Sequence, residues 1–207
     1  MAKITKFNQS DVEIVAKKRT FNGFFKIDEY HFRHALFAGG QSEIVVREIF
    51  ERGDAVAVLP YDPKLDAVLL IEQIRIGALS DKKSPWLLEV IAGMTDGSKD
   101  YESVVKKEAK EESGIELSNL EFMLSYLSSP GGTSERLYLY YAEADLSRAG
   151  GLFGVPDEGE DIKVHVLPVK QAFQLLDEGE MDNAATVICL QWLKLNIEAI
   201  REKYLTC

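Results

Sequence analysis

The chain has 207 residues, of which 28% are charged and 46% hydrophobic, as is usual for a globular protein. Its formal net charge of −10 argues against binding to the phosphate backbone of a nucleic acid, which requires a basic surface. A small phosphorylated ligand stays possible, because a bound metal ion can supply the positive charge that the chain lacks. The composition therefore predicts a globular protein without a nucleic-acid partner.

The cysteines and the apolar runs indicate the cellular compartment in which the protein is expected. Cys189 and Cys207 belong to no CxxC pair, so neither a zinc site nor a disulfide framework is expected. The first residues lack the apolar core of a signal peptide, and no later run approaches the ~18 apolar residues of a membrane span. We therefore expect a cytoplasmic protein with no membrane partner.

Short strands are predicted near the start of the chain, over Val12–Ala16, Phe24–Phe32 and Ser42–Phe50. Strands this short bury too little apolar surface to be stable alone. We therefore expect residues 1–50 to form a small N-terminal antiparallel β subdomain, packed on the rest of the chain or on a second copy of it.

Strands and helices alternate in residues 51–207. Apolar runs predict five strands, which are Ala55–Leu59, Ala67–Ile71, Trp86–Ile91, Leu137–Ala142 and Val164–Leu167. Helical periodicity predicts three helices, which begin at Asp100, Lys170 and Asn183 and end at Gly114, Asp177 and about Tyr204. Strands combined with helices in this way predict an α+β fold, an α/β/α sandwich around a mixed sheet.

The helix predicted after Asp100 carries three glutamates on one face. Glu108, Glu111 and Glu112 are spaced i, i+3 and i+4, so their carboxylates project close together. Two carboxylates ~4 Å apart repel by about 4 kcal/mol at an effective dielectric constant of about 20. The fold must hydrate them, raise their pKa values or supply a cation, and carboxylate oxygens suit Mg²⁺ or Mn²⁺. On this spacing alone, a solvated acidic face is the commoner explanation.

The surroundings of the helix favour a metal site. Gly93 lies after a predicted strand, and Ala92-Gly93 is expected to form a tight turn with free backbone carbonyls. The whole stretch resembles the signature of the Nudix hydrolase family, GX5EX7REUXEEXGU, in which U is apolar. Seven of its nine specified positions match in register, and they are Gly93, Glu108, Ala109, Glu111, Glu112, Gly114 and Ile115.

Two signature positions differ from the family. Lys99 stands where the family has glutamate, and Lys107 stands where it has arginine. In the family these two residues typically form ionic support for the loop and helix, and two lysines cannot pair. Lys107 and Glu111 are spaced for an i, i+4 ion pair instead. We therefore expect the differences to affect the rigidity of the loop and turnover more than metal binding.

Four segments outside the signature look like the bacterial ADP-ribose pyrophosphatases of this family. They are Glu72–Arg75, Trp86–Gly93, Ser129–Arg136 and Asp157–Asp161. Each has an ordinary explanation when taken alone, such as a turn rich in proline and glycine or a solvated acidic loop. Together they imply a homodimer whose N-terminal strands exchange between subunits, with residues 51–207 forming the hydrolase domain.

The resemblance also implies roles for the acidic residues. The Ala92 carbonyl, Glu108 and Glu112 would be the main ligands of Mg²⁺ or Mn²⁺, and Glu111 would support them. In the segment Asp157–Asp161, called the acidic loop below, Glu158 would be the general base and Glu160 a further metal contact. The sequence does not separate these two roles. The expected catalytic residues are therefore Glu158, Glu111 and Glu112.

The implied substrate is a nucleoside diphosphate sugar. ADP-ribose and water would give AMP and ribose 5-phosphate, and the residues expected to bind the substrate are Arg47, Glu72, Arg75, Gly93 and Glu135. Two other functions fit the same fold. One is a nucleotide-sugar hydrolase of the GDP-mannose type, and the other is a non-catalytic module that binds ADP-ribose, which Lys99 and Lys107 would favour.

Overall fold

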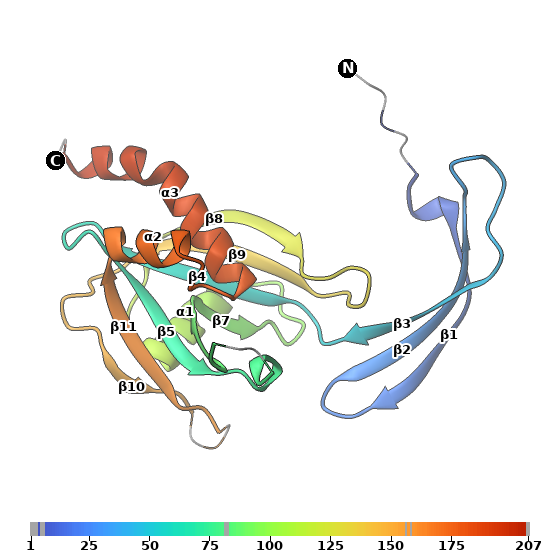
Figure 1. Ribbon diagram of the computed structural model, residues 1–207, viewed down its shortest axis with the longest axis horizontal. Helices are drawn as coiled ribbons and strands as arrows, with labels where there is room; N and C mark the ends of the chain where they lie inside the picture. The colour runs from blue at the N-terminus through green and yellow to red at the C-terminus, as the bar shows by residue number, and fades with distance from the viewer. Residues whose placement is uncertain (1–3, 5–6, 81–82, 156, 158, 206–207) are drawn as a thin grey trace. The chain divides into compact units, whose positions relative to one another are not determined.

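The computed structural model describes residues 4, 7–80, 83–155, 157 and 159–205 (Figure 1). The chain forms two compact units. The first comprises Met1–Gly53 and Leu127–Arg136, and the second comprises Asp54–Tyr126 and Leu137–Cys207. The expected N-terminal β subdomain covers residues 1–50, whereas the inclusion of Leu127–Arg136 in the same unit has no signal in the sequence.

The first unit contains a three-stranded antiparallel sheet in the order β1-β2-β3. Its strands are β1 (Val12–Asn22), β2 (Lys26–His34) and β3 (Val45–Glu51), and a short 3-10 helix η1 (Gln9–Asp11) precedes them. The loop from Leu127 joins this sheet because Thr133 Oγ1 donates to the Phe50 carbonyl at 2.7 Å. Every residue of β1 is exposed, so this edge strand buries no side chain within the described chain.

The second unit is built on an eight-stranded sheet with the order β10-β11-β5-β4-β9-β8, in which β6 pairs with β5 and β7 with β4. Its strands are β4 (Ala55–Asp62), β5 (Ala67–Ile74), β6 (Trp86–Glu89), β7 (Ile91–Met94), β8 (Ser118–Leu127), β9 (Arg136–Glu143), β10 (Gly151–Phe153) and β11 (Ile162–Pro168). Strands β4 and β9 run parallel, whereas β4 and β5 run antiparallel. The predicted mixed sheet is therefore confirmed.

Helices cover both faces of this sheet (Figure 1). Helix α1 (Tyr101–Ser113) packs on one face, and α2 (Val169–Asp177) and α3 (Ala184–Leu205) pack on the other. The predicted α/β/α sandwich is confirmed. Among the described residues, no helix combines the length and the apolar character that crossing a membrane requires.

Alternation along β5 assigns its side chains to these two layers. Leu69 and Ile71 belong to the apolar cluster that includes α1, whereas Val68 and Leu70 belong to the cluster that includes α2 and α3. Successive strand residues point to opposite faces. Odd-numbered residues of β5 therefore face α1, and this fixes the layer to which the polar residues at its end belong.

Candidate active site

Helix α1 has well-defined ends. Asp100 caps its N-terminus by accepting from the Ser103 N–H at 3.2 Å and from the Ser103 hydroxyl at 2.7 Å. Gly114 ends the helix in the left-handed conformation, with φ of 69°, which a residue with a Cβ adopts only with strain. Both predicted ends of the helix are confirmed, and they fix the positions of the glutamates between them.

The three glutamates of α1 differ in exposure. The Glu112 residue is 4% exposed, and the side chains of Glu108 and Glu111 are 16% and 40% exposed. The difference arises because Val105 and Ala109 are buried against the sheet, and Glu112 lies on that side of the helix. The acidic face is therefore not a uniformly solvated surface, since one of its carboxylates lies inside the protein.

Glu112 is the buried carboxylate next to β7. Its Oε2 accepts from the Ala92 N–H at 3.2 Å. Burial raises the pKa of Glu112 to about 8, the Ala92 N–H opposes this increase, and the charges of Glu108 and Glu160 reinforce it. The desolvated Glu112 carboxylate would attract a positive charge, so we expect a cation beside it.

Glu108 is held against Gly93. A Cβ on Gly93 would lie 2.2 Å from Glu108 Cδ, which no real contact allows. Glycine is therefore required at position 93 so that the Glu108 carboxylate can approach the β7 backbone. Burial also raises the pKa of Glu108, and Lys107 opposes that increase.

Ala92 and Gly93 lie in strand β7, opposite Ala57 and Val56 of β4. The prediction of a tight turn at this position is therefore wrong. The N–H and C=O of one strand residue point to the same edge. Because the Ala92 N–H points to Glu112 rather than to β4, its carbonyl also points away from β4, and it stays available to a ligand.

Lys107 holds two of the glutamates. Its Nζ lies 2.8 Å from Glu111 Oε2 and 3.3 Å from Glu108 Oε1. The predicted i, i+4 pair of Lys107 with Glu111 is confirmed. Lys99 makes no ion pair with any residue that the structure describes.

Glu160 of the acidic loop, Asp157–Asp161, influences these glutamates through its charge. The charge of Glu160 raises the pKa of both Glu108 and Glu112, although burial is the larger influence on each. Glu160 Oε2 also accepts from the Val155 N–H at 3.1 Å, which closes the loop on itself. Glu158, the expected general base, lies outside the described residues.

Arg75 and Glu72 were both expected to bind substrate, and the structure places them in different layers. Arg75 follows β5 and forms an ion pair with Glu89, with Nη2 2.9 Å from Oε2. Glu72 shares the α2–α3 face with Leu70 and accepts from His165 Nε2 at 2.8 Å. Glu89 was not singled out from the sequence, although an acidic residue within an apolar run is a sign of a buried, partnered carboxylate.

Arg47 and Glu135 belong to the first unit. Glu135 is 8% exposed, and its Oε1 lies 3.1 Å from Arg52 Nε. This contact is an ion pair without hydrogen-bond alignment, because Arg52 Nε has no hydrogen-bond partner in the described chain. Arg47 donates to the Val46 carbonyl at 2.7 Å and lines a groove of about 590 Å³, together with Pro130 and other residues of the first unit.

The donors around Glu112 suit a hard divalent cation. No three His, Cys, Asp or Glu side chains converge into a complete metal site within the described part of the chain. Mg²⁺ does not need such a set, because it is usually bound by one or two carboxylates together with water and substrate phosphates. Glu108, Glu112 and the Ala92 carbonyl meet that requirement, and a cation would compensate the free-energy cost of burying the Glu112 charge.

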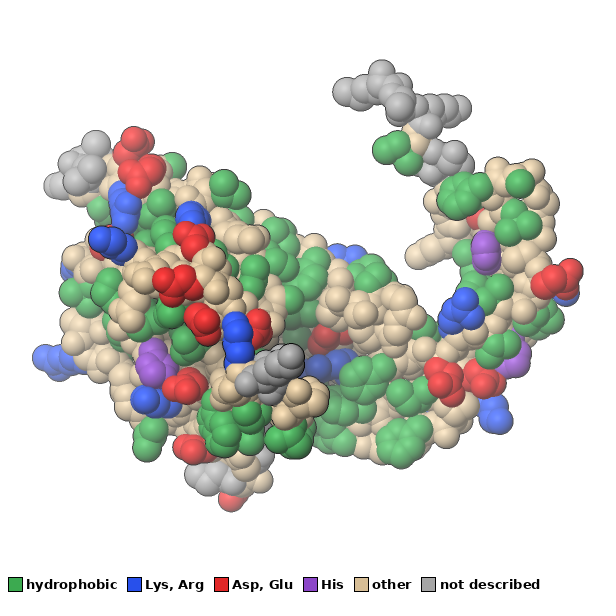
Figure 2. Space-filling view, viewed as in Figure 1, with side chains coloured by type: hydrophobic (Ala, Val, Ile, Leu, Met, Phe, Trp, Pro, Cys, Tyr) green, Lys and Arg blue, Asp and Glu red, His purple; other side chains and the backbone are tan. Residues whose placement is uncertain are grey.

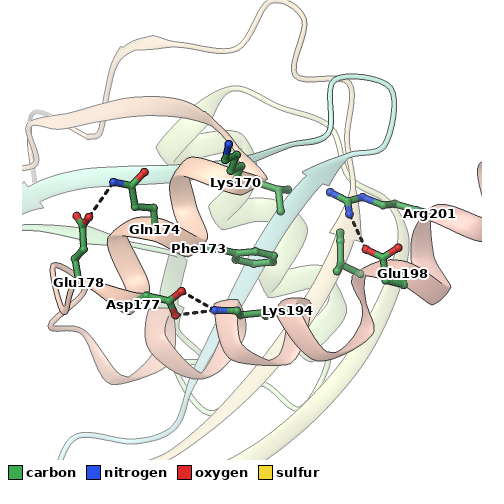
Figure 3. A pocket seen from close by; sticks show the side chains of 10 residues that line it. Lys170, Phe173, Gln174, Asp177, Glu178, Lys194, Glu198 and Arg201 are labelled. Carbon is green, nitrogen blue, oxygen red and sulfur yellow. Dashed lines mark hydrogen bonds and ion pairs between the residues drawn. The ribbon is translucent and has the colours of Figure 1, made fainter.

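Another groove, of about 740 Å³, lies between α2 and α3 (Figure 3). It contains none of the expected site residues. Two pairs of its charged side chains bind each other, and Figure 3 shows them as Lys194 with Asp177 and Arg201 with Glu198. On the face of the second unit seen in Figure 2, acidic and basic side chains are interspersed in the same way.

Replacing Gly93 with alanine is expected to weaken Mg²⁺ binding by about 10- to 100-fold, because the new Cβ would displace Glu108. Isothermal titration calorimetry with Mg²⁺ measures the effect. Gly77→Ala is the matched control, since its Cβ meets no described atom within 4 Å. Equal Mg²⁺ affinity in Gly93→Ala and wild type would contradict a role for Glu108 as a ligand.

Comparison with known proteins bears on this site. The model of the NUDIX domain family matches residues 51–188, which include β7, α1 and the acidic loop. A solved structure described as an ADP compounds hydrolase superposes with a TM-score of 0.71, covering 95% of this chain and 100% of its own. At 19% sequence identity, that likeness concerns the fold alone.

Curated relatives match over almost their whole length. The ADP-ribose pyrophosphatase of Escherichia coli strain K12 is 49% identical over 198 residues, covering 96% of this chain and 95% of the relative. The ADP-ribose pyrophosphatase of Haemophilus influenzae is 46% identical, covering 99% and 95%. The GDP-mannose pyrophosphatase of Pectobacterium atrosepticum is 35% identical, covering 88% and 93%. With its signature helix, its sandwich fold and these matches, the chain belongs to the NUDIX domain family.

Proposed function

We propose that the protein hydrolyses the diphosphate of ADP-ribose to AMP and ribose 5-phosphate, with Mg²⁺ as the metal ion. The observation that carries this proposal is the buried Glu112 carboxylate beside Glu108 and the Ala92 backbone. The two relatives at 49% and 46% identity, both ADP-ribose pyrophosphatases, support the choice of substrate. Mn²⁺ has similar ligand preferences and is expected to replace Mg²⁺.

In the proposed mechanism, Glu108, Glu112 and the Ala92 carbonyl would hold the metal ion. When bound, this ion would neutralise charge on the diphosphate and favour ionisation of the attacking water. Glu158 or Glu160 accepts the proton of that water. The water oxygen then forms a bond to one phosphorus of the diphosphate, and the bond from that phosphorus to the bridging oxygen breaks, so that AMP and ribose 5-phosphate leave as the two products.

The remaining residues bind and orient the substrate. Arg75 is expected to contact the phosphates from the α1 side of β5, and Gly93 leaves room for Glu108. The roles of Glu72, Arg47 and Glu135 in substrate binding stay predictions. Glu111, which is bound to Lys107, is expected to support the ligands without touching the metal ion.

A homodimer in the cytoplasm is part of the proposal. Apolar side chains of the edge strand β1 are 42–58% exposed, and they are Val12, Ile14, Val15 and Phe21. Exposed apolar strand edges favour pairing with another chain. We expect a second copy to cover this strand, and light scattering coupled to size-exclusion chromatography measures the mass.

The test of the substrate is a panel of nucleoside diphosphate sugars assayed with Mg²⁺. We expect kcat/KM for ADP-ribose to exceed that for GDP-mannose. The second candidate, a GDP-mannose hydrolase, is favoured by the Pectobacterium relative and would be supported by the reverse order. Binding of ADP-ribose without release of AMP would instead support a non-catalytic module.

A further inference from the structure

Glu89 is a buried carboxylate inside the apolar run that precedes the signature. It ends β6, lies opposite Ile71 of β5, and is 3% exposed. Taking a carboxylate out of water is costly unless hydrogen bonds and an opposite charge compensate it. The identity of its partners therefore shows what this residue holds in place.

Both oxygens of Glu89 are occupied. Oε2 accepts from Arg75 Nε at 2.9 Å, lies 2.9 Å from Arg75 Nη2, and accepts from Gln73 Nε2 at 3.3 Å. Oε1 accepts from Asn183 Nδ2 at 2.8 Å. Two nitrogens of the guanidinium meet the same oxygen, so Glu89 restricts the orientation of the Arg75 side chain.

The restricted guanidinium lies on the α1 side of β5, and α1 carries the predicted metal ligands Glu108 and Glu112. Ile71 and Gln73 lie on the α1 face of β5, because every second residue of a strand points to the same face. Arg75 is the next residue in this series. The Arg75 side chain is 46% exposed, so a phosphate in solution can approach it.

Asn183 links this arrangement to helix α3. Its Oδ1 accepts from the Thr186 N–H at 3.1 Å, which caps the helix, while its Nδ2 holds Glu89. Thr186 Oγ1 in turn accepts from the Val90 N–H at 2.9 Å. The junction of β6 and β7 is thereby fixed to the first turn of α3.

We propose that Glu89 is a positioning residue, which orients the Arg75 guanidinium toward the phosphates of a nucleoside diphosphate sugar and is itself held by Asn183. This inference rests on the proposed function, because it assigns Arg75 to the same substrate. Glu89 touches no reacting atom and acts only through Arg75. Its charge and its two occupied oxygens are the features that the role requires.

The test compares Glu89→Gln with Arg75→Ala and with the double variant. Glutamine keeps the size of the side chain but removes its charge. Its N–H₂ group is a donor and would face the donors that now bind Glu89. We expect kcat/KM for ADP-ribose to fall by about 10²-fold in Glu89→Gln, as a displaced positioning group causes. In the Arg75→Ala background, Glu89→Gln should have almost no further effect.

A matched control is Asp62→Asn. Asp62 is also 3% exposed, but within the described part of the chain it accepts only from backbone N–H groups, those of Lys64, Leu65 and Leu146. This variant is expected to lose thermal stability and to keep wild-type kcat and KM. Asn183→Ala is a milder change and should lower kcat/KM by less than Glu89→Gln. It replaces Glu89→Gln in the kinetic comparison if that variant does not fold.

A second readout needs no activity. In metal-free protein the Arg75 Nε–Hε group gives an NMR signal, which is assigned by its absence from Arg75→Lys. Its exchange with water should quicken in Glu89→Gln and stay unchanged in Asp62→Asn. Wild-type kcat/KM in Glu89→Gln, or additive losses in the double variant, would overturn the inference. Absence of hydrolysis by wild type would instead reject the proposed function.

Discussion

Replacing Glu112 with glutamine is expected to lower the rate of Mg²⁺-dependent AMP release from ADP-ribose by about 10³-fold, which corresponds to several kcal/mol of lost transition-state stabilisation. The amide keeps the shape of the side chain and an oxygen for the Ala92 N–H, so the fold should persist. What it removes is the negative charge that we propose as a ligand of the metal ion. The rate is measured by chromatography of AMP at saturating ADP-ribose.

Glu116→Gln is the control for this loss. Glu116 follows α1, its side chain is 86% exposed, and it pairs with Lys110 on the surface. This variant changes the same chemical group outside the site and should keep wild-type turnover. Near wild-type turnover in Glu112→Gln would show that Glu112 is not a metal ligand.

Glu112→Gln is also expected to stabilise the metal-free protein in alkaline solution. The pKa of Glu112 is about 8 in the folded chain and 4.5 when unperturbed. Between those values the folded state holds a proton that the unfolded state has lost. The contribution of Glu112 to the free energy of unfolding therefore falls as pH rises through this window and levels off above about pH 8.

Urea unfolding in EDTA measures this difference. At pH 5 wild type and Glu112→Gln should differ little in stability, because Glu112 is neutral in the folded state and pH 5 lies only slightly above its unperturbed pKa of 4.5. At pH 9 the variant should be more stable, by on the order of 3 kcal/mol. Added Mg²⁺ should then stabilise wild type selectively. A stability difference that does not change between pH 5 and pH 9 would contradict the burial of an ionisable Glu112.

Local signals made α1 predictable from the sequence. Asp100 supplies its N-cap and Gly114 its C-cap, and both act on backbone groups within one turn. The buried strands β4 and β5 were equally clear, since their apolar runs reflect burial on both faces. Such elements depend on residues that are adjacent in the chain.

Other elements depend on partners distant in sequence. Strand β8 was not predicted, because this edge strand is exposed at half of its positions and shows no regular apolar alternation. The three-residue strand β10 is too short to give a pattern. The run predicted as one strand over Trp86–Ile91 divides at Val90, where the chain leaves β5 and joins β4. Only the sheet decides where that run divides.

The site was predictable to the same extent. Spacing placed the α1 glutamates together, but their unequal burial follows from how α1 packs against the sheet. The pair of Glu89 and Asn183 joins residues 94 positions apart, which no local pattern shows. The ion pair of Lys107 with Glu111 was predictable, because it spans a single helical turn.

The most direct measurement uses purified wild-type protein that has been stripped of metal with EDTA and mixed with ADP-ribose. Addition of Mg²⁺ should start the release of AMP and ribose 5-phosphate in equal amounts, and renewed EDTA should stop it. No AMP from folded protein with Mg²⁺ or Mn²⁺, or an equal rate in EDTA, would contradict metal-dependent hydrolysis of ADP-ribose at Glu108 and Glu112.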